Sequence, residues 1–287
     1  MNNPEPLPPV LYRFRSYGAP GRNGDDKATV HDMLLGRIRF ARLRDFNDPF
    51  EGRPKAIPAF DDAGEQRAAV LRYILDTARN FGISPSDARR RATALMKGKS
   101  QAEIVDWIGA KFWETFESDG LFICCLAGSE AIKGPVSWAH YADQHRGVAI
   151  HFDTKQPPVR FAYRVRYSET YPEVVVPRTY QDPWEQVQRA LMTKSSHWRY
   201  EDEYRAVRVD WPGNERHPEI AQLFVNWDGT TALAGAKAVS GITLGARMPD
   251  AERRHLLAFI ADKRSDLAVW QADLHRSRYE VITDQIR

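Results

Sequence analysis

Residues 135–153 constrain the fold most, because they predict a short helix that passes directly into a strand. Three aromatic side chains, Trp138, Tyr141 and His145, are spaced to share one face of such a helix. Gly147 stands where a helix commonly ends in a residue that tolerates a positive φ, and the residues after it alternate as in a half-buried strand. Aromatic residues at this density indicate either a site or a wedge of core side chains whose polar tips bond to the backbone.

The composition sets few limits on function. With 43% hydrophobic residues among 287, the chain can bury a sizeable core, and a net charge of +3 permits a nucleic-acid partner without requiring one. No apolar run approaches the roughly 20 residues of a membrane span. Residues 1–9 lack the pattern of a secretory signal, and we expect them to be disordered. The two cysteines, Cys124 and Cys125, are adjacent in a predicted buried strand, which favours reduced core residues in a cytoplasmic protein.

Residues 10–15 predict the first strand. Its alternation places Tyr12 and Phe14 on one face and Arg13 and Arg15 on the other. Two guanidinium groups on one strand face require anions. These anions are either carboxylates at a sheet edge or the phosphate and ribose oxygens of a ligand.

The middle of the chain, residues 61–118, shows helical periodicity and little strand signal. We interpret it as a helical insertion in a single α+β domain of residues 10–287. Three helices are expected, at about 62–80, 84–97 and 100–117.

The most basic patch of the insertion comprises Arg89, Arg90 and Arg91. Such a run is either a solvated helix face or a contact surface for nucleic acid.

A second notable stretch, residues 198–209, reads as a strand late in the chain. One face of that strand carries Glu201, Glu203 and Arg205 and then becomes apolar, so we expect it to face the core. A core face that turns charged at one end is typical of the floor of a binding cleft. The alternative is that Glu203 and Arg205 merely pair at the end of a sheet.

Several standard chemistries have no motif here: the chain shows no dinucleotide fingerprint, P-loop, nucleophile elbow or zinc spacing. The remaining features suit a site that holds an anionic dinucleotide and stabilises developing positive charge. Glu203 would lie beside a ribosyl cation, and Glu201 would orient or deprotonate an acceptor. Tyr141 and Trp138 would clamp a planar nicotinamide ring.

The chain resembles a bacterial family known only as a domain of unknown function, DUF2971, from about residue 10 to 284. The resemblance lies in residues 11–15, in the Phe-Asn-Asp-Pro-Phe-Glu run of residues 46–51, in the Ser-Trp-Ala-His-Tyr-Ala run of residues 137–142, and in residues 198–205. The family name implies no activity.

The chain is also similar to the ADP-ribosyltransferase superfamily, whose members place an Arg or His on the first strand, a Ser or Tyr in mid-chain and a late Glu, often in Glu-x-Glu. The positions that match are Arg13 or Arg15, then Ser137 or Tyr141, then Glu203 with Glu201. The middle motif departs from the superfamily pattern, because Trp-Ala follows Ser137.

This similarity implies a split mixed or antiparallel sheet and NAD as substrate, without a metal. ADP-ribose would pass to a nucleic acid or protein, in a toxin or anti-phage effector that an antitoxin or regulatory partner could control. The residues expected at the NAD site are Arg13, Arg15, Ser137, Trp138 and His145, with Tyr141, Glu201 and Glu203 as catalytic residues.

Two alternatives remain at this stage. One is a non-catalytic nucleotide- or nucleic-acid-binding module dominated by the basic patch. The other is a metal-dependent nuclease that uses carboxylates. Its candidate ligands are Asp48, Glu51, Glu201 and Glu203.

Overall fold

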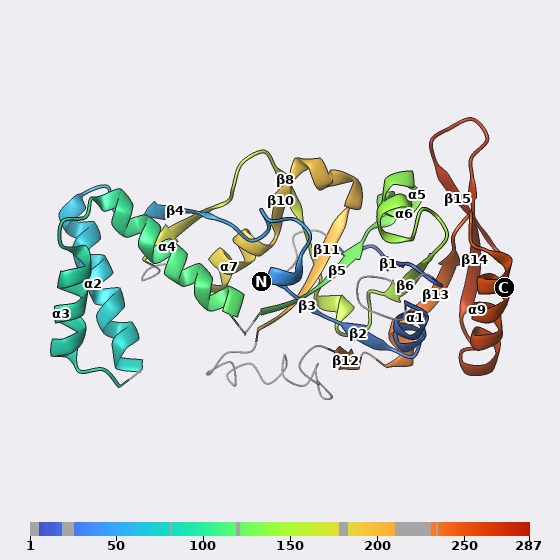
Figure 1. Ribbon diagram of the computed structural model, residues 1–287, viewed down its shortest axis with the longest axis horizontal. Coiled ribbons are helices and arrows are strands. Elements are labelled where there is room, and N and C mark those ends of the chain that lie inside the picture. The colour runs from blue at the N-terminus through green and yellow to red at the C-terminus, as the bar shows by residue number, and fades with distance from the viewer. Residues whose placement is uncertain are drawn as a thin grey trace. The chain divides into compact units, whose positions relative to one another are not determined.

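The computed structural model describes residues 6–18, 26–80, 82–118, 121–177, 183–209, 231–233 and 235–287. The chain divides into two compact units, each assembled from separate segments. Unit 1 comprises residues 1–45, 121–165 and 197–287, and unit 2 comprises residues 46–120 and 166–196. Figure 1 labels the helices and strands of both units.

Unit 1 is built on a nine-stranded sheet in the order β15-β14-β13-β6-β1-β5-β11-β7, with β3 paired to β5 off this path. Among the strand pairs of this sheet that the structure describes, β13 and β14 run parallel and the others antiparallel. The sheet is therefore mixed, as expected. Its strands are β1 (Val10–Arg15), β3 (Ala41–Arg42), β5 (Leu121–Ala127), β6 (Val148–Asp153), β7 (Tyr163–Arg164), β11 (Glu203–Val209), β13 (Val239–Leu244), β14 (Ala268–Leu274) and β15 (Val281–Gln285).

Each face of this sheet is covered by helices. The larger core includes Leu11, Cys124 and Tyr204 from the strands, and α1 (Asp26–Leu34) and α9 (Asp250–Lys263) contribute buried side chains to it. The smaller core, on the other face, takes side chains from α5 (Ser129–Lys133) and α6 (Pro135–Tyr141). Strand alternation explains the division, because successive side chains point to opposite faces. Outside the main sheet, β2 (Arg37–Arg39) pairs with β12 (Thr231–Leu233).

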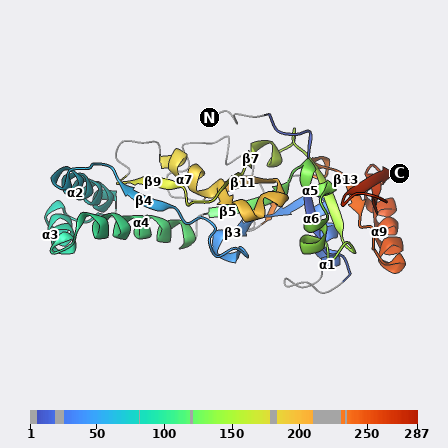
Figure 2. The ribbon, with the colours of Figure 1, turned by 90° about the horizontal axis from the view of Figure 1, so that it is seen from above.

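Unit 2 contains the three helices that the sequence predicts: α2 (Ala63–Asn80), α3 (Pro85–Met96) and α4 (Gln101–Ser118). The helices α2 and α3 lie side by side in both ribbon views (Figures 1 and 2). Ser84 caps α3 by accepting a hydrogen bond from the backbone N–H of Asp87 at 3.2 Å. Two parallel pairs and one helix complete the unit: β4 (Lys55–Pro58) with β9 (Glu173–Val176), β8 (Arg166–Ser168) with β10 (Thr193–Ser195), and α7 (Pro183–Leu191).

The helix predicted within residues 135–147 is shorter than the pattern indicates. The helix α6 ends at Tyr141, and the next residues Asp143, Gln144 and His145 all have positive φ, of 45°, 54° and 69°. The prediction that His145 shares a helical face with Tyr141 is therefore wrong. Gly147 does not adopt a positive φ in this structure, and it is required for another reason: a Cβ there would clash with the backbone carbonyl of Arg15.

In the part of the chain that the structure describes, no helix is both long and apolar enough to cross a membrane.

Candidate functional site

The strand register brings three side chains into one row across the sheet of unit 1. Tyr12 on β1 lies opposite Ala127 on β5, and Ala127 lies opposite Glu203 on β11. Residues directly opposite in a sheet project to the same face, and Arg205, two residues after Glu203, projects there too. We call this the carboxylate face. The small Ala127 side chain separates the phenol from the carboxylate.

On the carboxylate face, Glu203 and Arg205 form a bidentate ion pair. The guanidinium donates from Nε to Oε1 of Glu203 at 2.8 Å and from Nη2 to Oε2 at 3.1 Å. The exposed fraction of the side chain is 0% for Arg205 and 5% for Glu203. A buried pair of this kind fixes both side chains, because breaking it would leave an uncompensated charge in the protein interior.

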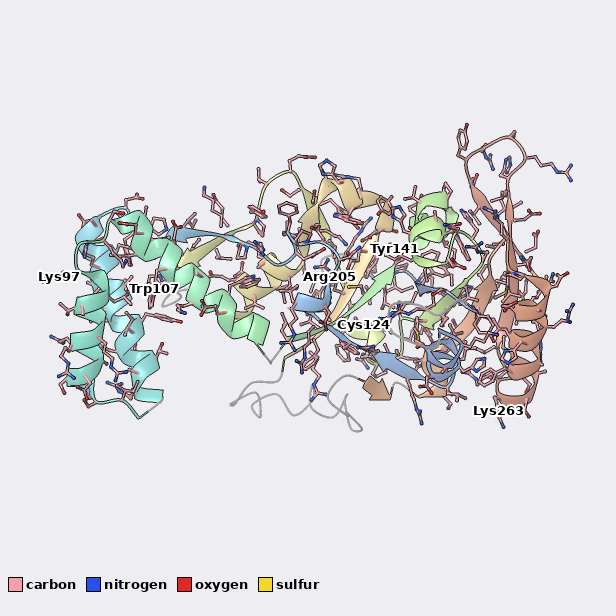
Figure 3. All side chains as sticks on the ribbon, in the orientation of Figure 1. Lys97, Trp107, Cys124, Tyr141, Arg205 and Lys263 are labelled. Atoms are coloured by element: carbon pink, nitrogen blue, oxygen red, sulfur yellow. The ribbon has the colours of Figure 1, made fainter. Side chains whose placement is uncertain are left out.

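Glu201 belongs to a different element from Glu203. It is the last residue of a 3-10 helix, Ser196–Glu201, and Asp202, with φ of 42°, separates that helix from β11. The prediction that both glutamates share one strand face is wrong. Glu201 accepts a short hydrogen bond from the Tyr141 hydroxyl at the end of α6. Both residues were expected to be catalytic, Tyr141 at the nicotinamide ring and Glu201 at the acceptor, but no contact between them was predicted. Figure 3 labels Tyr141 at α6 and Arg205 on β11.

Both sides of β11 are buried where the strand begins. Tyr204 and Ala206 enter the larger core, whereas Glu203 and Arg205 lie on the opposite face and are 4% and 0% exposed. The prediction that the face carrying Glu203 and Arg205 turns inward is therefore confirmed at these two residues, whose charges are buried as an ion pair.

A chain of partly exposed aromatic rings begins beside Tyr141, whose ring meets that of His140 at 6.0 Å between centroids. The Tyr200 hydroxyl lies 3.0 Å from Nδ1 of His140, and their rings meet edge to face at 5.7 Å. Trp198 lies 6.0 Å from Tyr200 between ring centroids. His140 is exposed, and the other two are half-buried. No role was predicted for these three residues, although aromatic side chains close to Glu201 in the sequence are a signal that could have found two of them, Trp198 and Tyr200.

Arg13 and Arg15 are not on the carboxylate face. Both alternate with Tyr12 and Phe14 along β1, as predicted, and so project to the opposite side of the sheet. There Arg13 donates from Nη1 to the carbonyl of Arg39 at 2.8 Å and approaches the Cys124 sulfur at 3.2 Å. The structure therefore separates the predicted anion-binding arginines from Tyr141, Glu201 and Glu203.

Ser137 and Trp138 are core residues. Trp138 is fully buried, and its indole N–H donates to the carbonyl of Ile132 at 2.8 Å. Ser137 is 1% exposed and its hydroxyl lies 3.5 Å from the carbonyl of Tyr200. The polar atoms of both side chains bond to the backbone. The sequence left open that these aromatic and polar residues form part of the core, and the structure has that arrangement. In it, neither the Trp138 ring nor the Ser137 hydroxyl is available to a ligand.

His145 remains beside Trp138 in spite of lying outside the helix. The two rings are nearly parallel, at 6.3 Å between centroids. Burial lowers the pKa of His145, and the nearby positive charge of Arg247 lowers it further. His145 is therefore a neutral imidazole at neutral pH, packed on a core tryptophan.

On the carboxylate face, opposite Tyr12 in the register of β1 and β6, His151 is buried between two aromatic residues. It stacks on Trp270 at 4.5 Å and meets the edge of Tyr12 at 4.9 Å, while its Nε2 lies 2.7 Å from the Thr243 hydroxyl. Burial lowers the pKa of His151 to about 3. Burial also raises the pKa of Tyr12, and this effect is larger than that of the positive charge of Lys133, which lowers the pKa. Both side chains are neutral at physiological pH.

The basic patch lies in unit 2. Arg89, Arg90 and Arg91 are exposed on α3, and Arg90 pairs with Asp87 at 2.6 Å. Among the described residues, no acidic side chain forms a salt bridge with Arg89.

The carboxylates proposed for a metal-dependent nuclease each have a partner within their own unit. In unit 2, Asp48 accepts the backbone N–H of Phe50 at 2.9 Å and Glu51 pairs with buried Lys194 at 3.2 Å. In unit 1, Glu201 and Glu203 have the partners described above. Over the described ranges, no group of three or more His, Cys, Asp and Glu side chains is arranged to hold a metal ion.

The described fold and site thus define a mixed α/β protein with a pair of buried carboxylates at one end of a strand. A family model described as "Protein of unknown function (DUF2971)" matches residues 137–206, which contain α6 from its third residue onward, the aromatic rings and both glutamates. Over these residues the chain is similar to the DUF2971 family. Comparison with curated proteins finds no match. Comparison with solved structures finds none either.

Proposed function

We propose that this protein is an NAD-dependent ADP-ribosyltransferase with its reacting centre at Glu201 and Tyr141. The observation that carries the proposal is the hydrogen bond from the Tyr141 hydroxyl to the Glu201 carboxylate, set among partly exposed aromatic rings. A carboxylate so placed can stabilise a ribosyl cation, and rings beside it can stack on a planar base.

The chemistry requires little beyond these groups. The bond between C1′ of the ribose and the nicotinamide nitrogen breaks, and nicotinamide leaves with the bonding electrons. Glu201 stabilises the positive charge on the ribose, and an acceptor hydroxyl or amine then forms a bond to C1′. The acceptor proton passes to Glu201, which acts as general base.

Within this proposal Glu203 holds the side chain of Arg205 in place and does not itself react. Both of its oxygens bind Arg205, and the pair is buried. This exchanges the roles expected from the sequence, where Glu203 was the reacting group. Arg13, Arg15, Ser137 and Trp138 have no part in the site, because they lie on the opposite face or in the core.

The experiment is to identify the product. Purified protein is incubated with NAD alone, and in further reactions with NAD together with RNA, DNA or cell-lysate protein. Free nicotinamide and the mass of the acceptor are then measured. We expect nicotinamide release together with an acceptor heavier by one ADP-ribose, and neither with Glu201→Gln. A modified acceptor would establish transfer and identify the class of target on which a toxin or defence effector of this kind would act. Release without a modified acceptor would make it a glycohydrolase, and no release would overturn the proposal.

A second function is favoured by the exposed arginines of α3. In this reading the protein binds nucleic acid without catalysis, and Arg89, Arg90 and Arg91 neutralise phosphates. Replacing all three by Gln should then weaken RNA or DNA binding and flatten its dependence on salt, whereas Glu201→Gln should not. Binding that is indifferent to the triple substitution would exclude this reading.

A further inference from the structure

Away from the carboxylate face, three side chains from separate segments of unit 1 meet at one phenol oxygen. Tyr17 follows β1, His31 lies on α1 and His255 on α9. The Tyr17 hydroxyl lies 3.0 Å from Nε2 of His31 and 2.6 Å from Nδ1 of His255. Two imidazole nitrogens thus converge on one phenol oxygen.

Hydrogen bonding can join the three side chains when no metal is bound. A phenol has one proton, so it can donate to one imidazole and must accept from the other. The same three atoms, with the phenol deprotonated, form a donor set of two nitrogens and one oxygen. Imidazole suits zinc, copper, iron and nickel ions.

The spacing of the donors is close to what a metal ion requires. With metal–nitrogen and metal–oxygen bonds of about 2.0–2.1 Å, neighbouring donors of a tetrahedral ion lie roughly 3.3 Å apart. The separation of 3.0 Å between Tyr17 and His31 needs little adjustment. The separation of 2.6 Å to His255 reflects a hydrogen bond and would widen once the proton leaves.

The surroundings hold the ligands and leave the site accessible. The His31 ring stacks on Phe259 at 3.7 Å with a 3° interplanar angle, which fixes its orientation. Tyr17 is buried, whereas His255 is exposed, so an ion can approach from the side of α9. Two charged side chains lie close by: Lys27, at 5.8 Å from the Tyr17 ring, and Glu252, which pairs with Lys27 at 3.7 Å.

We propose that Tyr17, His31 and His255 form a binding site for one transition-metal dication of the zinc or copper class. On binding, the Tyr17 proton is released to solvent, the phenolate oxygen and the two neutral imidazole nitrogens donate electron pairs, and water completes the coordination. The bound charge of +2 less the lost proton adds one positive charge beside the ion pair of Lys27 and Glu252. The proposal is independent of the activity proposed for Glu201.

The test titrates metal-free, untagged protein with Cu²⁺ and with Zn²⁺ at neutral pH by calorimetry. For Cu²⁺ it also records the visible absorption from phenolate-to-copper charge transfer. We expect one ion per chain, a charge-transfer band and a higher melting temperature with Zn²⁺. Tyr17→Phe should lose the band and weaken binding at least tenfold, and His255→Gln should weaken binding by a similar factor.

His275→Gln, in the turn between β14 and β15, is the matched control and should bind as the unchanged protein does. Melting without metal shows that each variant is folded. Absence of stoichiometric binding, or a band and affinity that survive Tyr17→Phe, would overturn the proposal and leave a hydrogen-bonded triad that joins α1 to α9.

Discussion

Glu201 and Glu203 are two residues apart in the sequence but have different environments. Glu203 is bound through both oxygens by Arg205, whereas Glu201 meets the hydroxyl of Tyr141. The sequence suggested a Glu-x-Glu pair with shared geometry, because strand alternation puts residues i and i+2 on one face. It could not show that Asp202, with its positive φ of 42°, breaks the strand between them.

The pKa of His151 gives a test at the residue scale. A histidine whose pKa falls to about 3 on folding stays neutral in the folded protein while the unfolded chain takes up a proton below about 6.5. The unfolded state then binds more protons, so the free energy of unfolding falls as pH drops from about 6.5 towards 3, by at most about 1.4 kcal/mol per pH unit.

Urea unfolding at pH 7, 6 and 5 measures this pH dependence of the free energy of unfolding. We expect the stability of the unchanged protein to fall more steeply with acid than that of His151→Gln, in which the amide keeps a polar partner for Thr243. The difference between the two curves isolates His151 from the other histidines. Parallel curves would show that His151 does not titrate as the structure implies.

At the scale of elements, the sequence predicted much of the secondary structure but not the end of α6. Hydrophobic alternation located β1, and the helical periods located α2, α3 and α4. Residues 143–145 give no such signal, because Asp, Gln and His are not the residues that usually adopt consecutive left-handed conformations. The family match that begins at residue 137 covers this turn.

Substitution at Gln144 tests the left-handed turn. At a φ of 54° a β-branched side chain is strained and glycine is not, so Gln144→Val should be less stable than Gln144→Gly by about 1–2 kcal/mol. The same two substitutions at exposed Thr93, inside α3, should give the opposite order, since glycine is the poorer helix former. Urea unfolding compares the four variants. Equal stability of the two Gln144 variants would argue against the turn.

For the whole molecule, the expected insertion at residues 61–118 is part of a larger unit. Its helices pack with Val176, a residue of β9 far along the chain, and Gln66 donates to the carbonyl of Val176 at 2.8 Å. Such long-range pairing has no local sequence signature. The compositional change at residue 61 could therefore indicate the helices but not the segment 166–196 that completes unit 2.

This pairing predicts how fragments behave. Residues 61–118 alone lack Val176 and should unfold at lower urea than residues 46–120 joined by a Gly-Ser linker to residues 166–196. Circular dichroism of both fragments during a urea titration makes the comparison. Equal midpoints would mean that the helices form a self-sufficient unit.

The position of the reacting centre on one face of the sheet is the central claim, and nicotinamide release from NAD tests it most directly. Glu201→Gln removes the reacting carboxylate, and Arg13→Gln removes a charge on the opposite face. We predict that Glu201→Gln lowers kcat at least about a hundredfold and that Arg13→Gln stays within a few-fold of the unchanged protein, with both variants folded by melting temperature. Full activity in Glu201→Gln, or loss of release in folded Arg13→Gln, would contradict the account.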